Sequence, residues 1–77
     1  MVNKKILLER INLLLDRADM PKRVDERAAA FAKLFNVDFY TSYDILSGVI
    51  VPNDKLLQTI ADEFEVEKSW LMGEDKK

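Results

Sequence analysis

The chain has 77 residues, a formal net charge of −2, and neither cysteine nor histidine. This length suits one domain, and the residue types exclude a disulfide framework, a Cys/His zinc site, a thiol nucleophile and an imidazole base. The chain is 48% apolar and 34% charged, with only two glycines and two prolines, which disfavours both disorder and a β-sandwich or barrel. We therefore expect an all-α, compact domain without a metal site, a cofactor, a catalytic residue or enzymatic activity.

Positive charge is concentrated in the first part of the chain. Residues 1–33 carry a net +3, residues 34–54 carry −3, and residues 55–77 carry −2. A basic surface must therefore come mainly from the first 33 residues. Glu9 and Arg10 interrupt the apolar run 6–8, so the sequence predicts no signal peptide or membrane span, and the cytoplasm is the expected compartment.

Apolar residues recur at helical spacing from residue 4 to residue 18, and Asn3 is suited to cap this first helix. Pro21 interrupts the chain before a second helix, which we expect to run from an Asp25 cap to about Phe35. Asn36 follows at a position that favours the left-handed conformation, so it is expected to end the second helix.

A third helix is predicted over 39–47, with Asp38 as its cap and Gly48 at its end. The apolar run 49–51 has no partner strand in the sequence, so we expect an extended, partly buried loop. Residues 52–54 then open a fourth helix that runs to about residue 64.

A short fifth helix is predicted to begin at Glu67 and to stop at Gly73. Residues 74–77 are expected to form a charged, frayed tail. The predicted domain therefore spans residues 1–73 and contains five helices.

Residues 31–48 have the organisation of a helix-turn-helix, in which one helix, a short turn and a second short helix follow each other. Ala32 is small enough to let the two helices approach closely. Helical pairs that bind no nucleic acid are also common, so this corner alone leaves DNA binding open.

Sequence motifs extend this pattern over most of the chain. They comprise Phe31, Ala32, Phe35, Val37 and Asp38, then residues 45–48 (Ile-Leu-Ser-Gly), then Pro52, Leu56, Ile60, Ala61, Phe64, Val66, Trp70, Leu71 and Gly73. With these residues the chain resembles the lambda-repressor-like family of DNA-binding domains, the Cro and phage-repressor type, over residues 6–73. The resemblance implies a five-helix bundle that binds operator DNA as a dimer, with the third helix in the major groove, and thus a transcriptional regulator of phage or prophage type.

Carried over to this sequence, the resemblance implies that Phe39, Tyr40, Tyr43 and Asp44 face the bases. None of them is an arginine, lysine, asparagine or glutamine, the usual readers of guanine and adenine, so base reading is weakened. Ser42 stands where the family usually buries a valine-like side chain. Either Ser42 bonds back to a carbonyl, or the helix rolls to bury Phe39 and Tyr43 instead.

The residues expected to contact phosphates lie near the starts of the second and fourth helices, and the resemblance adds one residue within the third helix. They are Lys22, Arg23, Arg27, Thr41, Asn53 and Lys55. Double-stranded DNA is therefore the expected partner, and neither a membrane nor a small-molecule substrate is predicted.

Apolar residues that the predicted core does not need indicate a weak homodimer through Leu71, Met72 and Leu13. The alternative function is a protein-interaction module on the same helical fold, with little or no DNA binding. In that case Phe39, Tyr40, Tyr43 and the loop 49–51 would form an aromatic and apolar patch for a partner protein.

Overall fold

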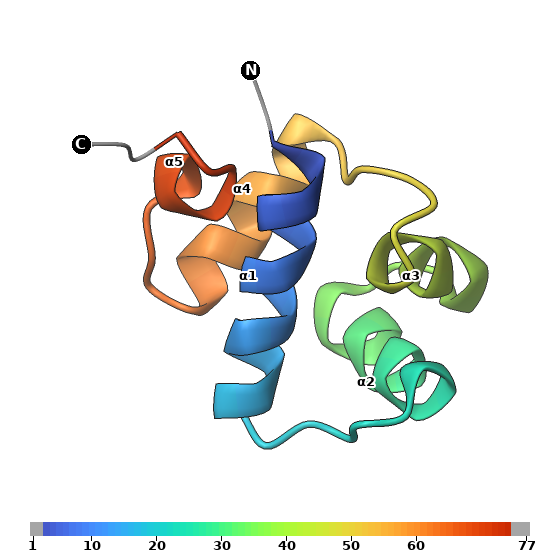
Figure 1. The fold of residues 1–77 in the computed structure, drawn as a ribbon. Coiled ribbons are helices and arrows are strands. Elements are labelled where there is room, and N and C mark those ends of the chain that lie inside the picture. The colour runs from blue at the N-terminus through green and yellow to red at the C-terminus, as the bar shows by residue number, and fades with distance from the viewer. Residues whose placement is uncertain (1–2, 75–77) are drawn as a thin grey trace.

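The computed structural model of the chain describes residues 3–74, which form five α-helices joined by short loops (Figure 1). No strand occurs within this range. The helices are α1 (Lys4–Arg17), α2 (Val24–Phe35), α3 (Phe39–Leu46), α4 (Asp54–Glu63) and α5 (Lys68–Leu71). The prediction of an all-α protein with five helices is therefore confirmed for the part of the chain that is described.

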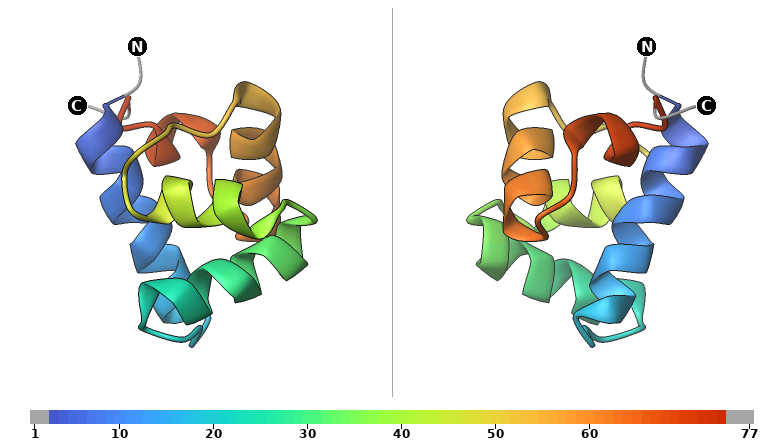
Figure 2. Two further views of the ribbon diagram at one scale, coloured as in Figure 1. Left: turned by 90° about the vertical axis from the view of Figure 1, so that its right-hand side faces the viewer. Right: turned by 90° about the vertical axis from the view of Figure 1, so that its left-hand side faces the viewer.

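Helix α1 runs through the middle of the molecule. In Figure 1, α2 and α3 lie on one side of it, α5 lies on the other, and α4 passes behind it. Figure 2 shows that α3 also lies between α1 and α4, above α2. Among all pairs of helices, α2 and α3 pack most extensively. The short helix α3 is thus held from several directions, which a helix of its length requires.

Three helices begin at side-chain caps, two of which, Asn3 and Asp38, are predicted from the sequence. The side-chain oxygens of Asn3, Asp38 and Asn53 each accept a hydrogen bond from the backbone amide three residues later, at 3.1, 3.1 and 2.8 Å. Each bond satisfies an amide that has no partner in the first helical turn. These caps fix where α1, α3 and α4 start.

The start of α2 differs from the prediction. Its N-cap is Arg23, and no side chain makes a capping hydrogen bond. Asp25 lies inside the first turn, where its carboxylate accepts the Glu26 amide at 2.8 Å and pairs with Arg23 at 2.9 Å. The prediction that Asp25 caps the helix is wrong because the helix starts one residue before it, at Val24. In the first turn, the carboxylate still lies at the favourable end of the helix dipole.

Two left-handed residues shape the ends of the α2–α3 segment. Asn36 ends α2 with φ +57°, as expected. Gly48 follows α3 with φ +85°, and a Cβ at this position would lie only 3.1 Å from the Leu8 side chain. The glycine therefore permits both the turn and the close approach of α1.

The core is built from side chains of all five helices. The largest fully buried side chains are Phe31, Leu7, Ile11, Leu15, Ile60, Leu71 and Ser42. Leu71 is 0% exposed because α5 packs against both α1 and α4, so the prediction that Leu71 lies at a dimer contact is wrong. Met72 is half-buried against the core, whereas Leu13 is 41% exposed.

The two ends of the described chain meet beside α1. The backbone N–H of Asn3 donates to the carbonyl of Met72 at 3.0 Å. Glu74, the first residue of the predicted tail, donates its backbone N–H to the carbonyl of Ser69 at 2.8 Å, so this residue is still bonded to α5. Residues 75–77 of that tail lie outside the described residues.

Candidate functional site

Ser42 fixes the rotation of α3 about its axis. Its side chain is fully buried, and its Oγ donates to the carbonyl of Asp38 at 2.9 Å. The hydroxyl is thereby satisfied inside the protein, which removes most of the cost of burying it. Of the two alternatives raised by the sequence, the back-bond to a carbonyl is therefore the one observed, and α3 does not roll to bury Phe39 and Tyr43.

Another side of α3 carries three aromatic side chains, of which Phe39 contacts the other two. Phe39, Tyr40 and Tyr43 are 38%, 77% and 36% exposed. The Phe39 ring lies 5.4 Å from Tyr40 in an edge-on arrangement and 6.0 Å from Tyr43, measured between centroids. We call these three residues the aromatic cluster. It forms a surface of flat rings with two hydroxyl groups, a combination that suits contact with another macromolecule.

Asp44, the fourth residue predicted to face bases, is half-buried at the edge of this surface. Its backbone carbonyl accepts the amides of Val49 and Ile50 at 2.8 and 3.3 Å. Val49, Ile50 and Val51 are all exposed, which differs from the partly buried loop that was predicted. Pro52 is buried instead, so it anchors the end of this loop.

Arg27 is a core residue. It is 4% exposed, and its guanidinium donates to the carbonyl of Pro21 at 2.6 Å, to Asn12 Oδ1 at 3.0 Å and to the Asp16 carboxylate at 2.5 Å. A further bond reaches the carbonyl of Met20 at 3.3 Å. The prediction that Arg27 contacts phosphate is wrong because these bonds hold the start of α2 and the loop before it against α1.

Three other basic residues predicted to bind phosphate lie on the surface. Lys22 pairs with Asp16 at 3.4 Å, and Arg23 pairs with Asp25 at 2.9 Å. Such exposed pairs are worth little, so a phosphate can compete for both cations. Lys55 is exposed, and its side chain has no hydrogen bond or ion pair with another residue of the described range.

Asn53 and Thr41, also predicted phosphate contacts, hold their own helices in place. Asn53 is exposed, but its side-chain oxygen is engaged as the cap of α4. Thr41 is half-buried, and its Oγ1 donates to the Asp38 carboxylate at 2.6 Å. The amide nitrogen of Asn53 therefore remains available to a ligand, whereas the Thr41 hydroxyl is committed to the cap of α3.

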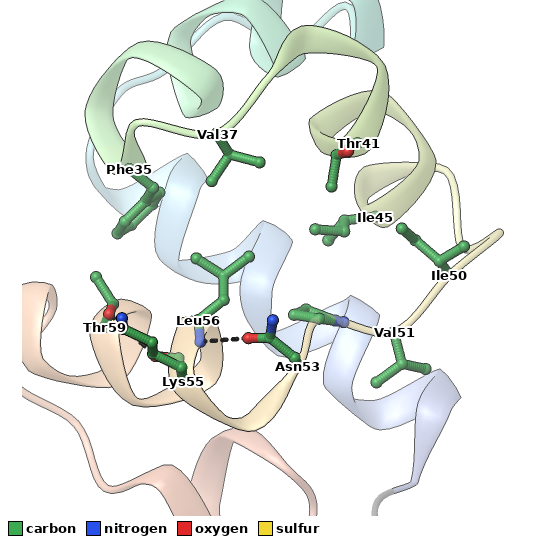
Figure 3. Close-up of a pocket in the computed structure, with 11 residues that line it drawn as sticks. Phe35, Val37, Thr41, Ile45, Ile50, Val51, Asn53, Lys55, Leu56 and Thr59 are labelled. Carbon is green, nitrogen blue, oxygen red and sulfur yellow. Dashed lines mark hydrogen bonds between the residues drawn. The ribbon is translucent and has the colours of Figure 1, made fainter.

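A pocket that the sequence did not indicate lies between α3 and α4 (Figure 3). Its volume is about 420 Å³. Phe35 and Val37 lie at one end of it, Ile45 lines it from α3, and Leu56 points into it from α4 (Figure 3). The pocket combines residues from four separate segments, and no local motif reveals such a combination.

None of the family models, characterised proteins and solved structures compared with this chain matches it. No helix between residues 3 and 74 has the length and apolar character needed to cross a membrane. Within the same residues, acidic side chains do not gather into a group that could hold a metal ion.

Three aspartates have pKa values below the usual 3.8. At Asp16 the main cause of the lowered pKa is the hydrogen bond from Arg27. At Asp25 it is the hydrogen bond from the Glu26 amide, and at Asp38 it is the hydrogen bond from the Thr41 hydroxyl. In each case the ionised form is favoured in the folded state relative to the unfolded chain. The stabilisation that the three ionised carboxylates give the fold is therefore complete above about pH 5. It is lost as the pH falls through their lowered pKa values in the folded state.

We accordingly expect stability to be nearly constant from pH 7 to pH 5 and to fall from there towards pH 2. Urea unfolding at a series of pH values measures this. Asp38→Asn keeps a side chain that can cap α3 but removes the titrating group, so its acid-dependent loss should be smaller than that of the parent chain. An identical pH profile for the variant would contradict the role assigned to the Asp38 carboxylate.

Proposed function

We propose that the chain is a transcriptional regulator of the phage-repressor type that binds double-stranded DNA, with α2 and α3 acting as a helix-turn-helix. The observation that carries the proposal is the orientation of α3. One side of α3 is anchored in the core through Ser42, while the aromatic cluster on its other side faces solvent. Insertion into a major groove requires a short helix with one face fixed to the protein core and another face exposed.

The cations that remain on the surface support this proposal. Lys22 and Arg23 precede α2, and Lys55 lies in the first turn of α4. The left-hand view of Figure 2 shows α3 between the start of α2 below and the start of α4 above. Phosphates on either side of a groove that holds α3 would therefore meet a helix N-terminus and a basic side chain together.

The same surface limits sequence discrimination. The aromatic cluster offers ring edges to thymine methyl groups and two tyrosine hydroxyls as hydrogen-bonding groups, and it contains no bidentate reader of guanine or adenine. Because Arg27 is buried, it adds nothing to the contact with DNA. We infer that phosphate contacts supply most of the binding free energy and that single-site discrimination is low.

A titration of the chain against random-sequence duplex DNA at two salt concentrations tests the proposal. Affinity should fall with salt by about 0.9 log units per tenfold change for each phosphate contacted. Lys55→Ala should weaken binding to all duplexes alike and reduce the salt slope by about one. Lys33→Ala removes an exposed lysine from the last turn of α2 and is the matched control, which should change binding less. Absence of binding at low salt would overturn the proposal.

A weak symmetric dimer remains part of this proposal, now limited to Leu13 and Met72. Two copies would place their α3 helices about 34 Å apart, one turn of the duplex. Leu13→Glu is expected to leave folding intact, because the side chain is 41% exposed, and to reduce the stoichiometry on a palindromic duplex from two chains to one. Sedimentation of the complex measures this ratio. A complex of two chains that is unaffected by Leu13→Glu would place the contact elsewhere.

A second candidate function is a protein-interaction module. It is favoured by the exposed aromatic cluster together with exposed Val49, Ile50 and Val51, which are apolar side chains on one continuous part of the chain. This candidate predicts no salt-dependent binding to duplex DNA, so the titration above also separates the two functions.

A further inference from the structure

We propose that the pocket between α3 and α4 binds a small amphipathic anion, a carboxylate with an apolar tail of medium length. Binding of this ligand needs only the folded chain, so the inference goes beyond the proposed contact with DNA and does not depend on it. The size of the pocket, the chemistry of its walls and the position of one lysine support this ligand class.

The size and lining of the pocket are those of a ligand site. A volume of about 420 Å³ lies within the range of 300–1,000 Å³ that is typical of small-molecule pockets. Apolar side chains supply most of the walls: Phe35, Val37, Ile45, Ile50, Val51, Pro52 and Leu56. Water gains few hydrogen bonds against such walls, so an apolar tail that displaces it is favoured.

The hydroxyl groups in the walls are already satisfied within the protein. Thr41 Oγ1 donates to Asp38 at 2.6 Å, and Thr59 Oγ1 donates to the carbonyl of Lys55 at 3.0 Å. Asn53 uses its oxygen to cap α4. These groups therefore do not require a polar ligand in the interior of the pocket, which favours an aliphatic tail over a sugar or another polyhydroxyl compound.

Charge complementarity selects an anion for the other end of the ligand. Lys55 is the single ionisable residue among those that line the pocket, and no carboxylate lines it. The Lys55 side chain also forms no ion pair or hydrogen bond with another residue of the described range. A carboxylate at the rim would thus gain a cation without meeting a like charge, while the tail of the ligand lies against Ile45 and Leu56 (Figure 3).

The pocket and the aromatic cluster occupy different sides of α3. Thr41 and Ile45 face the pocket, whereas Phe39, Tyr40 and Tyr43 do not line it. A macromolecule that contacts only the aromatic cluster would therefore leave the pocket walls on α3 and α4 to a separate, small ligand. This separation favours a small molecule over a partner protein as the occupant.

Decanoate and the uncharged decanol, each below its aggregation limit and without DNA, are the probes that test the proposal. Amide NMR shifts should change at Thr41, Ile45 and Leu56 with both probes. Lys55→Met should weaken decanoate binding about two- to five-fold, the range expected for one exposed ion pair, and should leave decanol binding unchanged. Lys33→Met, which removes a lysine outside the pocket, should alter neither affinity.

A variant that fills the pocket gives the second arm of the test. Leu56→Trp should abolish the binding of both probes. If this variant unfolds, Thr59→Trp serves the same purpose, because Thr59 lines the pocket and is exposed. Circular dichroism checks folding. Absence of shifts with either probe, retained binding in the filled variant, or equal affinity of decanoate for the parent and Lys55→Met would each overturn the proposal. A failure of DNA binding leaves these results unchanged, so the two proposals are judged separately.

Discussion

Replacing Arg27 with alanine is expected to lower the free energy of unfolding by about 3 kcal/mol or more. The change removes the hydrogen bonds that Arg27 donates to Asn12, Asp16, Pro21 and Met20. Those of the acceptor atoms that are shielded from water then have no donor. A domain of this size rarely has more than about 3–5 kcal/mol of net stability, so the variant should be largely unfolded at 37 °C. Urea or thermal unfolding followed by circular dichroism measures the loss.

Arg23→Ala is the matched control for Arg27→Ala. It removes an arginine four residues earlier, whose exposed pair with Asp25 should contribute less than about 1 kcal/mol. If Arg27→Ala were as stable as Arg23→Ala, the buried guanidinium would not join α1 to α2 as described. Arg27→Lys separates charge from geometry, since a lysine keeps the charge but lacks the planar fork that reaches several acceptors at once, and it should recover only part of the loss.

Phe31→Ala is expected to destabilise the fold by about 3–5 kcal/mol, through lost apolar burial and the cavity that remains. Phe31 is 0% exposed, and its ring lies 4.7 Å from that of Phe35, which in turn lies 6.3 Å from Phe64. These three rings connect α2 to the end of α4, so the variant should lose the cooperative thermal transition. Scanning calorimetry measures the transition directly.

Leu34→Ala tests whether the effect of Phe31→Ala comes from burial. Leu34 belongs to the same helix but is 45% exposed, so its truncation should change stability by about 0.5 kcal/mol or less. Similar losses from both substitutions would indicate a general weakening of α2 and would argue against a core centred on Phe31.

The helices could be predicted because their limits depend on local chemistry. Asn3 and Asp38 cap the helices that follow them, and Asn36 and Gly48 adopt the left-handed turns expected from their side chains. Each of these effects involves residues within four positions of each other. Asp25 shows the limit of this reasoning, because Arg23 provides the extended backbone before α2 and the carboxylate acts one turn further on.

Features that depend on distant residues could not be predicted in this way. Arg27 was expected on the surface because a single arginine in a charged stretch usually is, yet its partners Asn12 and Asp16 lie more than ten positions away in α1. Leu71 is predicted at a dimer surface because the predicted core does not need it, and nothing local in the sequence shows that α5 packs against α1. The pocket beside Leu56 likewise depends on how α3 and α4 are placed relative to each other, which the sequence does not show.

The backbone hydrogen bond between Asn3 and Met72 holds the two ends of the described chain next to each other. The last turn is tight, since a Cβ at Gly73 would lie 3.1–3.2 Å from atoms of Ile6 and Asn3. A linker of a few glycines between the two ends, with new ends opened in the exposed loop at Lys22, should therefore give a circularly permuted chain with the same core. In Figure 1, α5 lies on the opposite side of α1 from α3. A fluorescent protein or surface tether attached after α5 would consequently leave the aromatic cluster on α3 open to solution.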